Sequence, residues 1–265
     1  MPSPCTRPSR AERHERRPRA ETVSVPSARS LASRAAYEVM TMTSHFPRLA
    51  LRAARARGHG VVVTPTTDIV IEGYPRSGNS LAFASLLAAQ SASITIAHHT
   101  HAPANVIAGV EAGIPVLVLI RAPEDAVIGL VLIKPDLTVV QAMRGYRRFY
   151  EPILPYRDRI VVSRSEDVGD GSEALIERIN QRFGTSFDTL DVTANSRSTR
   201  DELIERYWRD RVGPGLPLLG RTERRRSEEL VDDVGSRARA EYLSAPASLR
   251  RRLSALYQSF TEDLP

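Results

Sequence analysis

The chain contains almost no cysteine and almost no lysine. Cys5 is its only cysteine, which excludes an internal disulfide and a metal site built from cysteines. Lys134 is its only lysine, so arginine supplies nearly all of the positive charge. No apolar run approaches the ~18 residues that a membrane-spanning helix needs, because the best run, residues 115–133, is broken by three charged side chains. We therefore expect a soluble, cytoplasmic protein with no membrane span.

A secretory signal is also missing. Residues 1–45 are rich in Pro, Ser, Ala and Arg, and they lack the apolar core of about 7–15 residues that such a signal contains. Because they have no sustained periodicity, we expect them to form a disordered basic arm before an α/β domain at residues 46–265. Other interpretations stay open: an upstream extension (Met40 and Met42 offer later starts), an arginine-rich transit peptide, or a nucleic-acid arm.

The excess of positive charge is confined to the start of the chain. Residues 1–60 hold 12 Arg against four Glu, a net charge of +8. The remaining 205 residues hold 25 basic and 27 acidic side chains, a net charge of −2. The domain itself is therefore not basic, and no nucleic-acid partner is expected for it. The sequence leaves the oligomeric state open.

Strand-like and helix-like segments alternate along the domain. The predicted strands, rich in aliphatic and β-branched residues, are 68–72, 91–97, 114–120 and 159–162. Alternation of this kind favours an α/β fold in which a parallel sheet lies between two layers of helices. Beyond residue 196 the pattern is mostly helical, most clearly at 200–211 and 227–242.

One stretch combines a strand, a loop and the start of a helix. Residues 68–72 form the strand, 73–79 are rich in small residues and turn formers, and an apolar helical pattern begins at Ser80. In this P-loop-like arrangement the loop N–H groups and the helix N-terminus converge on one place, which favours a phosphate there.

The loop differs from a Walker A motif in its cation. The motif G-x-x-x-x-G-K-[ST] is matched by Gly73, Gly78 and Ser80, but Asn79 stands at the lysine position. Hydrolysis of ATP or GTP therefore lacks its main charge stabiliser. Arg76, inside the loop, supplies a cation at a different place.

Two more polar clusters follow predicted strands. His99 and His101 come after the second strand, and Arg121 comes after the third. Ligands of open parallel sheets bind beyond the carboxyl ends of the strands, so we expect these side chains to approach the loop. Because side chains alternate along a strand, we expect His98 to point away from His99 and His101. No second cluster of ligands elsewhere in the sequence completes a metal site, so no metal is expected.

These clusters resemble motifs of the sulfotransferases. The six residues after Tyr74 match the 5′-phosphosulfate loop, P-[KR]-S-G-[TN]-[ST]; they are Pro75, Arg76, Ser77, Gly78, Asn79 and Ser80. Residues 99–103 are similar to K-T-H-[LF]-P, in which the histidine is the catalytic base. His101 occupies that position, and His99 replaces the lysine. Residues 116–129 resemble the 3′-phosphate segment, with Arg121 at the arginine and Gly129 at the serine.

The resemblance implies an activity and a set of site residues. The activity is transfer of a sulfuryl group from 3′-phosphoadenosine-5′-phosphosulfate (PAPS) to a hydroxyl of a small molecule, a glycan or a lipid-linked acceptor, without a metal. The catalytic residues would be His101 and Arg76. The residues that bind PAPS would be Pro75, Arg76, Ser77, Gly78, Asn79, Ser80, His99, Arg121 and Gly129.

The resemblance weakens after the third strand. Ser165 stands where the family often has an adenine-contacting tyrosine, and the C-terminal R-K-G segment has no clean counterpart, although Arg221 and residues 224–226 could substitute. Two alternatives therefore stay open: a nucleotide-dependent phosphoryl transferase with a degenerate Walker A loop, and a non-catalytic protein that binds a nucleotide such as 3′-phosphoadenosine-5′-phosphate (PAP).

Overall fold

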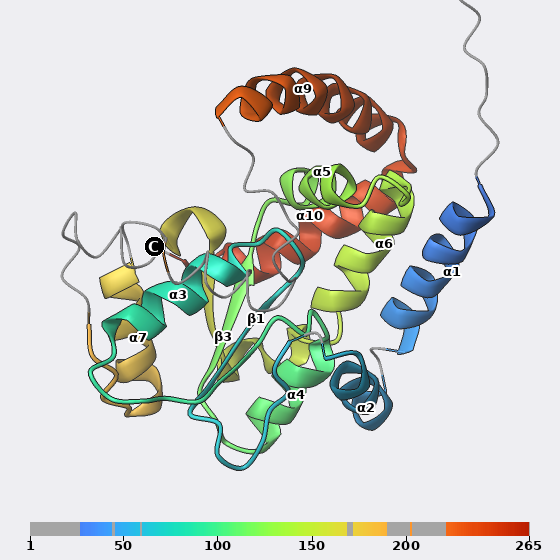
Figure 1. Ribbon diagram of the computed structural model, residues 1–265. Coiled ribbons are helices and arrows are strands. Elements are labelled where there is room, and N and C mark those ends of the chain that lie inside the picture. Colours follow the sequence, from blue (N-terminus) through green and yellow to red (C-terminus); the bar gives the residue numbers. More distant parts are fainter. Residues whose placement is uncertain are drawn as a thin grey trace, which may run out of the picture.

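The computed structural model describes residues 27–43, 46–58, 60–168, 172–189, 202 and 221–264 (Figure 1). These residues contain a parallel sheet in the order β2-β1-β3-β4. The strands are β1 (Ile69–Gly73), β2 (Ile96–His98), β3 (Val116–Ile120) and β4 (Val161–Arg164). The expected α/β class with a parallel sheet is confirmed. The second strand is shorter than the predicted 91–97.

The two central strands are buried on both faces because their side chains are almost all apolar. Ile69 and Ile71 of β1 lie in one core cluster with Leu117 and Leu119 of β3. Alternate residues of the same strands, such as Val70, belong to a second cluster on the other face. The near-continuous aliphatic pattern therefore reflects a sheet that is covered on both sides.

Helices supply most of the remaining side chains of both clusters. On the Ile69 face lie α3 (Asn79–Ala89) and α7 (Ser172–Phe183). The other cluster takes side chains from α4 (Pro103–Glu111), α5 (Pro123–Ile133), α6 (Val139–Tyr150), α9 (Arg221–Ser244) and α10 (Ala247–Thr261). The short 3₁₀ helices are η1 (Leu154–Arg159) and η2 (Ser165–Val168).

The C-terminal part is helical, as expected, in α9 and α10, whereas the helix predicted at 200–211 lies almost wholly outside the described residues. Within the described part of the chain, no helix is long and apolar enough to cross a membrane.

The expected disordered arm is wrong for residues 28–43. This segment forms α1 (Ala28–Thr43), followed by α2 (Pro47–Arg57), whereas residues 1–26 lie outside the described ones. Tyr37 of α1 is only 6% exposed, and its hydroxyl lies 3.3 Å from the hydroxyl of Tyr74. Arg148 of α6 donates to Glu38 and to Thr41 of α1. A helix that buries so narrow a face gives little hydrophobic periodicity, so the sequence pattern missed it.

Docking of α1 depends on a glycine in α6. A Cβ on Gly145 would lie 1.9 Å from the Tyr37 hydroxyl oxygen, so the two helices can approach only because residue 145 has no side chain. We expect Gly145→Ala to lower the free energy of unfolding by about 1–3 kcal/mol, the usual cost of overpacking. Urea denaturation measures this change.

Gly235→Ala in α9 is the matched control for this substitution. A Cβ there meets nothing within 4 Å, so the substitution should be neutral or should stabilise the helix by about 0.5–1 kcal/mol. If Gly145→Ala is as stable as Gly235→Ala, α1 is not docked against α6 in solution.

Candidate functional site

The loop between β1 and α3 has an unusual backbone. Arg76 and Gly78 both have left-handed φ angles, 71° and 90° respectively. An arginine rarely adopts such a φ, so the surrounding structure must hold it there. Tyr150 of α6 supplies much of that support. Its hydroxyl lies 3.3 Å from the backbone N of Tyr74 and 3.3 Å from Oγ of Ser77, and it donates to the carbonyl of Leu119 at 2.7 Å.

The side chain of Asn79 supports the loop through hydrogen bonds to its backbone. Its side-chain amide donates to the carbonyls of Gly73 and Tyr74 at 3.3 and 3.2 Å, and the residue is only 4% exposed. The residue that replaces the Walker lysine therefore uses its donors on the loop's own backbone. Only the backbone N–H of Asn79, in the first turn of α3, is left to contact an anion.

Arg76 and Arg121 lie together at the carboxyl ends of β1 and β3. Nη1 of Arg121 donates to the backbone carbonyl of Arg76 at 3.3 Å. Burial and the charge of Arg121 both lower the pKa of Arg76, burial having the larger effect. Neither guanidinium forms an ion pair with another described residue. Asp125 and Glu166 line the same pocket but form no ion pair with either arginine, so the two neighbouring cations favour bound anionic groups beside them.

Gly129 has a different role from the predicted contact with PAPS. It lies inside α5, so its N–H is committed to the helix rather than to a ligand. A Cβ at this position would lie 3.3 Å from both Cβ and Cγ of Arg76. The glycine therefore leaves room for the stem of Arg76, and a serine would press against it.

The histidine turn after β2 is held by a buried acid. Glu72 of β1 is fully buried and accepts hydrogen bonds from the N–H and the hydroxyl of Thr100 at 2.8 and 2.6 Å. It also accepts from the N–H of His101 at 3.0 Å and from the side-chain amide of Asn105 at 3.0 Å. The residues on either side of Thr100, His99 and His101, have left-handed φ angles of 57° and 51°. Glu72 thus fixes a strained turn that the sequence pattern did not reveal.

The imidazole of His101 is oriented by the backbone. Its Nδ1 lies 2.9 Å from the carbonyl oxygen of Gly73. A carbonyl can only accept, so Nδ1 carries the proton and Nε2 carries the lone pair. This is the tautomer that a general base requires.

His99 lies between Ser80 and His98. Its Nε2 is 3.0 Å from the hydroxyl of Ser80, and its Nδ1 is 2.7 Å from Nδ1 of His98. The expectation that His98 turns away from the other histidines is wrong, because the left-handed φ of His99 interrupts strand alternation. Among the residues described, no group of three His, Cys, Asp or Glu is placed to hold a metal ion.

The predicted side chains share one open pocket of about 570 Å³. Its lining includes Pro75, Arg76, Gly78, Asn79, Ser80, His99, His101 and Arg121. Ser165 and Glu166, which follow β4, also line this pocket, whereas Ser77 of the loop is fully buried and does not line it. The side chains of Arg221 and of residues 224–226 lie outside the described part of the structure.

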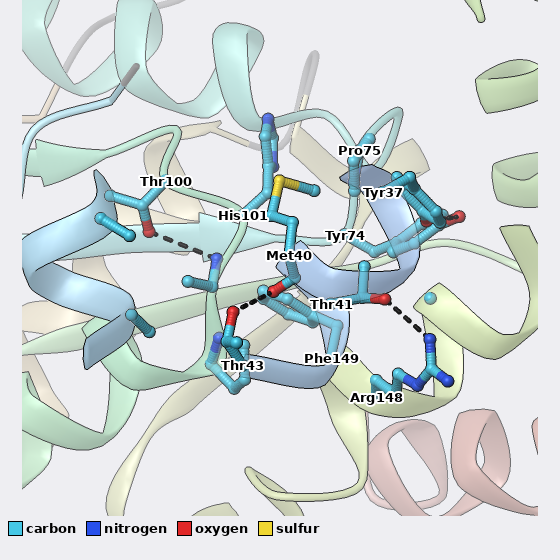
Figure 2. A pocket seen from close by; sticks show the side chains of 15 residues that line it. Tyr37, Met40, Thr41, Thr43, Tyr74, Pro75, Thr100, His101, Arg148 and Phe149 are labelled. Carbon is cyan, nitrogen blue, oxygen red and sulfur yellow. Dashed lines mark hydrogen bonds between the residues drawn. The ribbon is translucent and has the colours of Figure 1, made fainter. Parts of the chain in front are cut away.

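A second, smaller pocket adjoins the first (Figure 2). Its volume is about 30 Å³, enough for little more than one water. It lies between the loop, α1, α2 and α6, and Pro75 and His101 line both pockets. His101 therefore lies where the pocket with the two arginines meets the pocket beneath α1.

No family model matches the chain, and no curated protein or solved structure matches it significantly. The function is therefore argued from the geometry of the site.

Proposed function

We propose that the chain is a sulfotransferase that moves a sulfuryl group from PAPS to an acceptor hydroxyl. The observation that carries the proposal is the pair Arg76 and Arg121, two guanidiniums that share one pocket with the N-terminus of α3 and His101 and that no described acid pairs with. PAPS bears phosphate groups at the 5′ and 3′ positions of its ribose, and two neighbouring planar cations suit a ligand with two such groups.

The loop would hold the end of the donor that reacts. It follows a buried strand and precedes α3, so its N–H groups and the first turn of the helix support a P-loop-like cradle for the 5′-phosphosulfate. Arg76, whose stem fits beside Gly129, would contact the same group. Arg121 would bind the 3′-phosphate, which distinguishes PAPS from nucleotides without one.

His101 would act on the acceptor. Nε2 takes the hydroxyl proton while the acceptor oxygen forms a bond to sulfur. The bond between sulfur and the bridging oxygen breaks, and PAP leaves with the electron pair. Arg76 and the helix N-terminus offset the charge that develops on the leaving phosphate. These steps need only groups that line the two pockets.

Removal of one arginine tests the donor site. We expect Arg76→Ala to weaken the binding of PAP at least tenfold, because a charge-assisted hydrogen bond contributes roughly 1.5–3 kcal/mol. Isothermal titration calorimetry measures the affinity. Arg251→Ala, an exposed arginine on α10, is the matched control and should bind PAP like the wild-type protein.

The outcome also separates the alternatives. Wild-type affinity in a folded Arg76→Ala protein would remove the loop from the proposal. Tight binding of ATP that requires Mg²⁺, with weak binding of PAP, would favour a phosphoryl transferase. Tight binding of PAP without transfer to any acceptor in a broad panel would favour a non-catalytic nucleotide-binding protein.

A further inference from the structure

The first two helices expose an unusual amount of apolar surface. Eight large apolar side chains are exposed in the described part of the protein. Five of them belong to α1, to α2 or to Phe46, which directly precedes α2. These five are Leu31, Val39, Met42, Phe46 and Leu49, each at least 53% exposed. Together with the exposed arginines Arg52 and Arg55 of α2 they make up what we call the α1–α2 face.

Four exposed apolar residues of α1 form one stripe. Leu31, Ala35, Val39 and Met42 follow the spacing i, i+4, i+8, i+11, which places them along one side of a helix. Tyr37, which docks on α6, lies on a different side. The stripe is therefore a second apolar side of α1, which no described residue covers.

The charge of this region is strongly positive. Residues 28–58 contain six Arg against one Glu, a net charge of +5. That one acid, Glu38, is paired with Arg148 and lies 3.8 Å from Arg144. The chain beyond residue 60 carries a net charge of −2, so the excess of positive charge falls in the same part of the sequence as the exposed apolar residues.

We propose that the α1–α2 face binds the surface of a bilayer that contains anionic lipids. Phe46, Leu49 and the stripe of α1 would enter the boundary between headgroups and acyl chains, and Arg52 and Arg55 would contact the anionic headgroups. The combination of exposed apolar side chains with positive charge favours lipid over nucleic acid and over a second copy of the chain. Nucleic acid gains little from an aliphatic stripe, and a second copy of the chain would bring two faces of the same charge together.

The α1–α2 face lies close to the site, because the two helices that carry it also line the small pocket beside His101. Figure 1 shows both helices on one side of the molecule, away from α3 and α7. Met40 of α1 and Ala50 and Ala53 of α2 line the small pocket that His101 also lines (Figure 2). If the proposed function holds, membrane binding would bring an acceptor carried in the bilayer close to the general base.

Vesicle binding by the full chain tests the face without any assumption about catalysis. The protein is sedimented with phosphatidylcholine vesicles, or with vesicles that also contain phosphatidylserine. Binding should require phosphatidylserine and weaken as salt is raised. Leu49→Ser should weaken it several-fold, whereas Leu243→Ser, a control with the same exposure in α9, should not (54% and 53% exposed). Arg52→Gln with Arg55→Gln should weaken it by about fivefold for each arginine, and Arg251→Gln in α10 should not.

Other results would overturn the proposal. Binding that is equal for the two kinds of vesicle, or equal for Leu49→Ser and Leu243→Ser, would show that this face does not contact lipid. A wild-type protein that ignores vesicles but binds duplex RNA or DNA would assign the arginines to nucleic acid. Self-association that Leu49→Ser abolishes, without vesicle binding, would assign the face to a second copy. Because PAP affinity is measured separately, loss of the donor site would leave this result unchanged.

Discussion

Replacement of His101 with alanine is expected to abolish sulfuryl transfer while the affinity for PAP changes by less than about twofold. The imidazole lies between the two pockets, and its Nδ1 is fixed by the carbonyl of Gly73, which leaves the lone pair on Nε2. Loss of a general base lowers kcat and kcat/KM together, by at least ~10². The measurement is transfer of radiolabelled sulfate from PAPS to any acceptor that the wild-type protein modifies, with PAP affinity from calorimetry.

His99→Ala is the matched control for the base. His99 lies 3.0 Å from the hydroxyl of Ser80 in the pocket that Arg76 and Arg121 line, so its loss should weaken PAP binding more than it slows the chemical step. If His101→Ala keeps wild-type turnover while His99→Ala is inactive, the base has been assigned to the wrong histidine. The donor site, which rests on Arg76 and Arg121, would survive that result.

The elements around the loop could be predicted closely from the sequence. The strand expected at 68–72 is observed at 69–73, and the helix expected from Ser80 begins at Asn79. Both have strong local signals: a β-branched run, a turn rich in small residues, and a wide apolar helical pattern. The rule that strand ends converge then placed the loop, His101 and Arg121 at one pocket without knowledge of the strand order.

The features that escaped prediction depend on partners distant in the chain. Tyr150 supports the loop from 76 residues away, and Gly145 matters only because Tyr37 packs against it. The position of His98 depends on a left-handed φ at His99, which alternation cannot anticipate. One signal was present: an acid, Glu72, within a strand that otherwise reads as buried. Acids are almost never fully buried without partners, so this residue could have indicated a cluster of donors nearby.

Glu72 is also the residue whose loss we expect to be most damaging to stability. Glu72→Ala would leave the N–H groups of Thr100 and His101 without their acceptor in a buried place. A buried donor without a partner costs about 1–3 kcal/mol, so the two together predict a loss of roughly 2–6 kcal/mol in the free energy of unfolding. Urea denaturation measures it. Glu111→Ala, an exposed acid on α4, is the control and should change stability little.

The same acid should make stability depend on pH. Burial raises the pKa of Glu72 from 4.5 to about 7, although four hydrogen bonds to the carboxylate act in the opposite direction. The unfolded chain therefore releases this proton near the lower value and the folded chain near the higher one. Between these values the folded state binds more protons, so the free energy of unfolding falls as pH rises, by an amount on the order of a few kcal/mol.

Glu72→Gln isolates this contribution, because glutamine has the same shape and does not titrate. The variant loses one hydrogen bond, since its NH₂ group would face the N–H of His101 in place of Oε2. That loss is the same at every pH. The stability of the wild-type protein relative to Glu72→Gln should therefore decrease between about pH 4.5 and pH 7 and stay constant above about pH 8. A difference that stays flat across this range would show that Glu72 is ionised in the folded protein at all of these pH values, with its four donors outweighing burial.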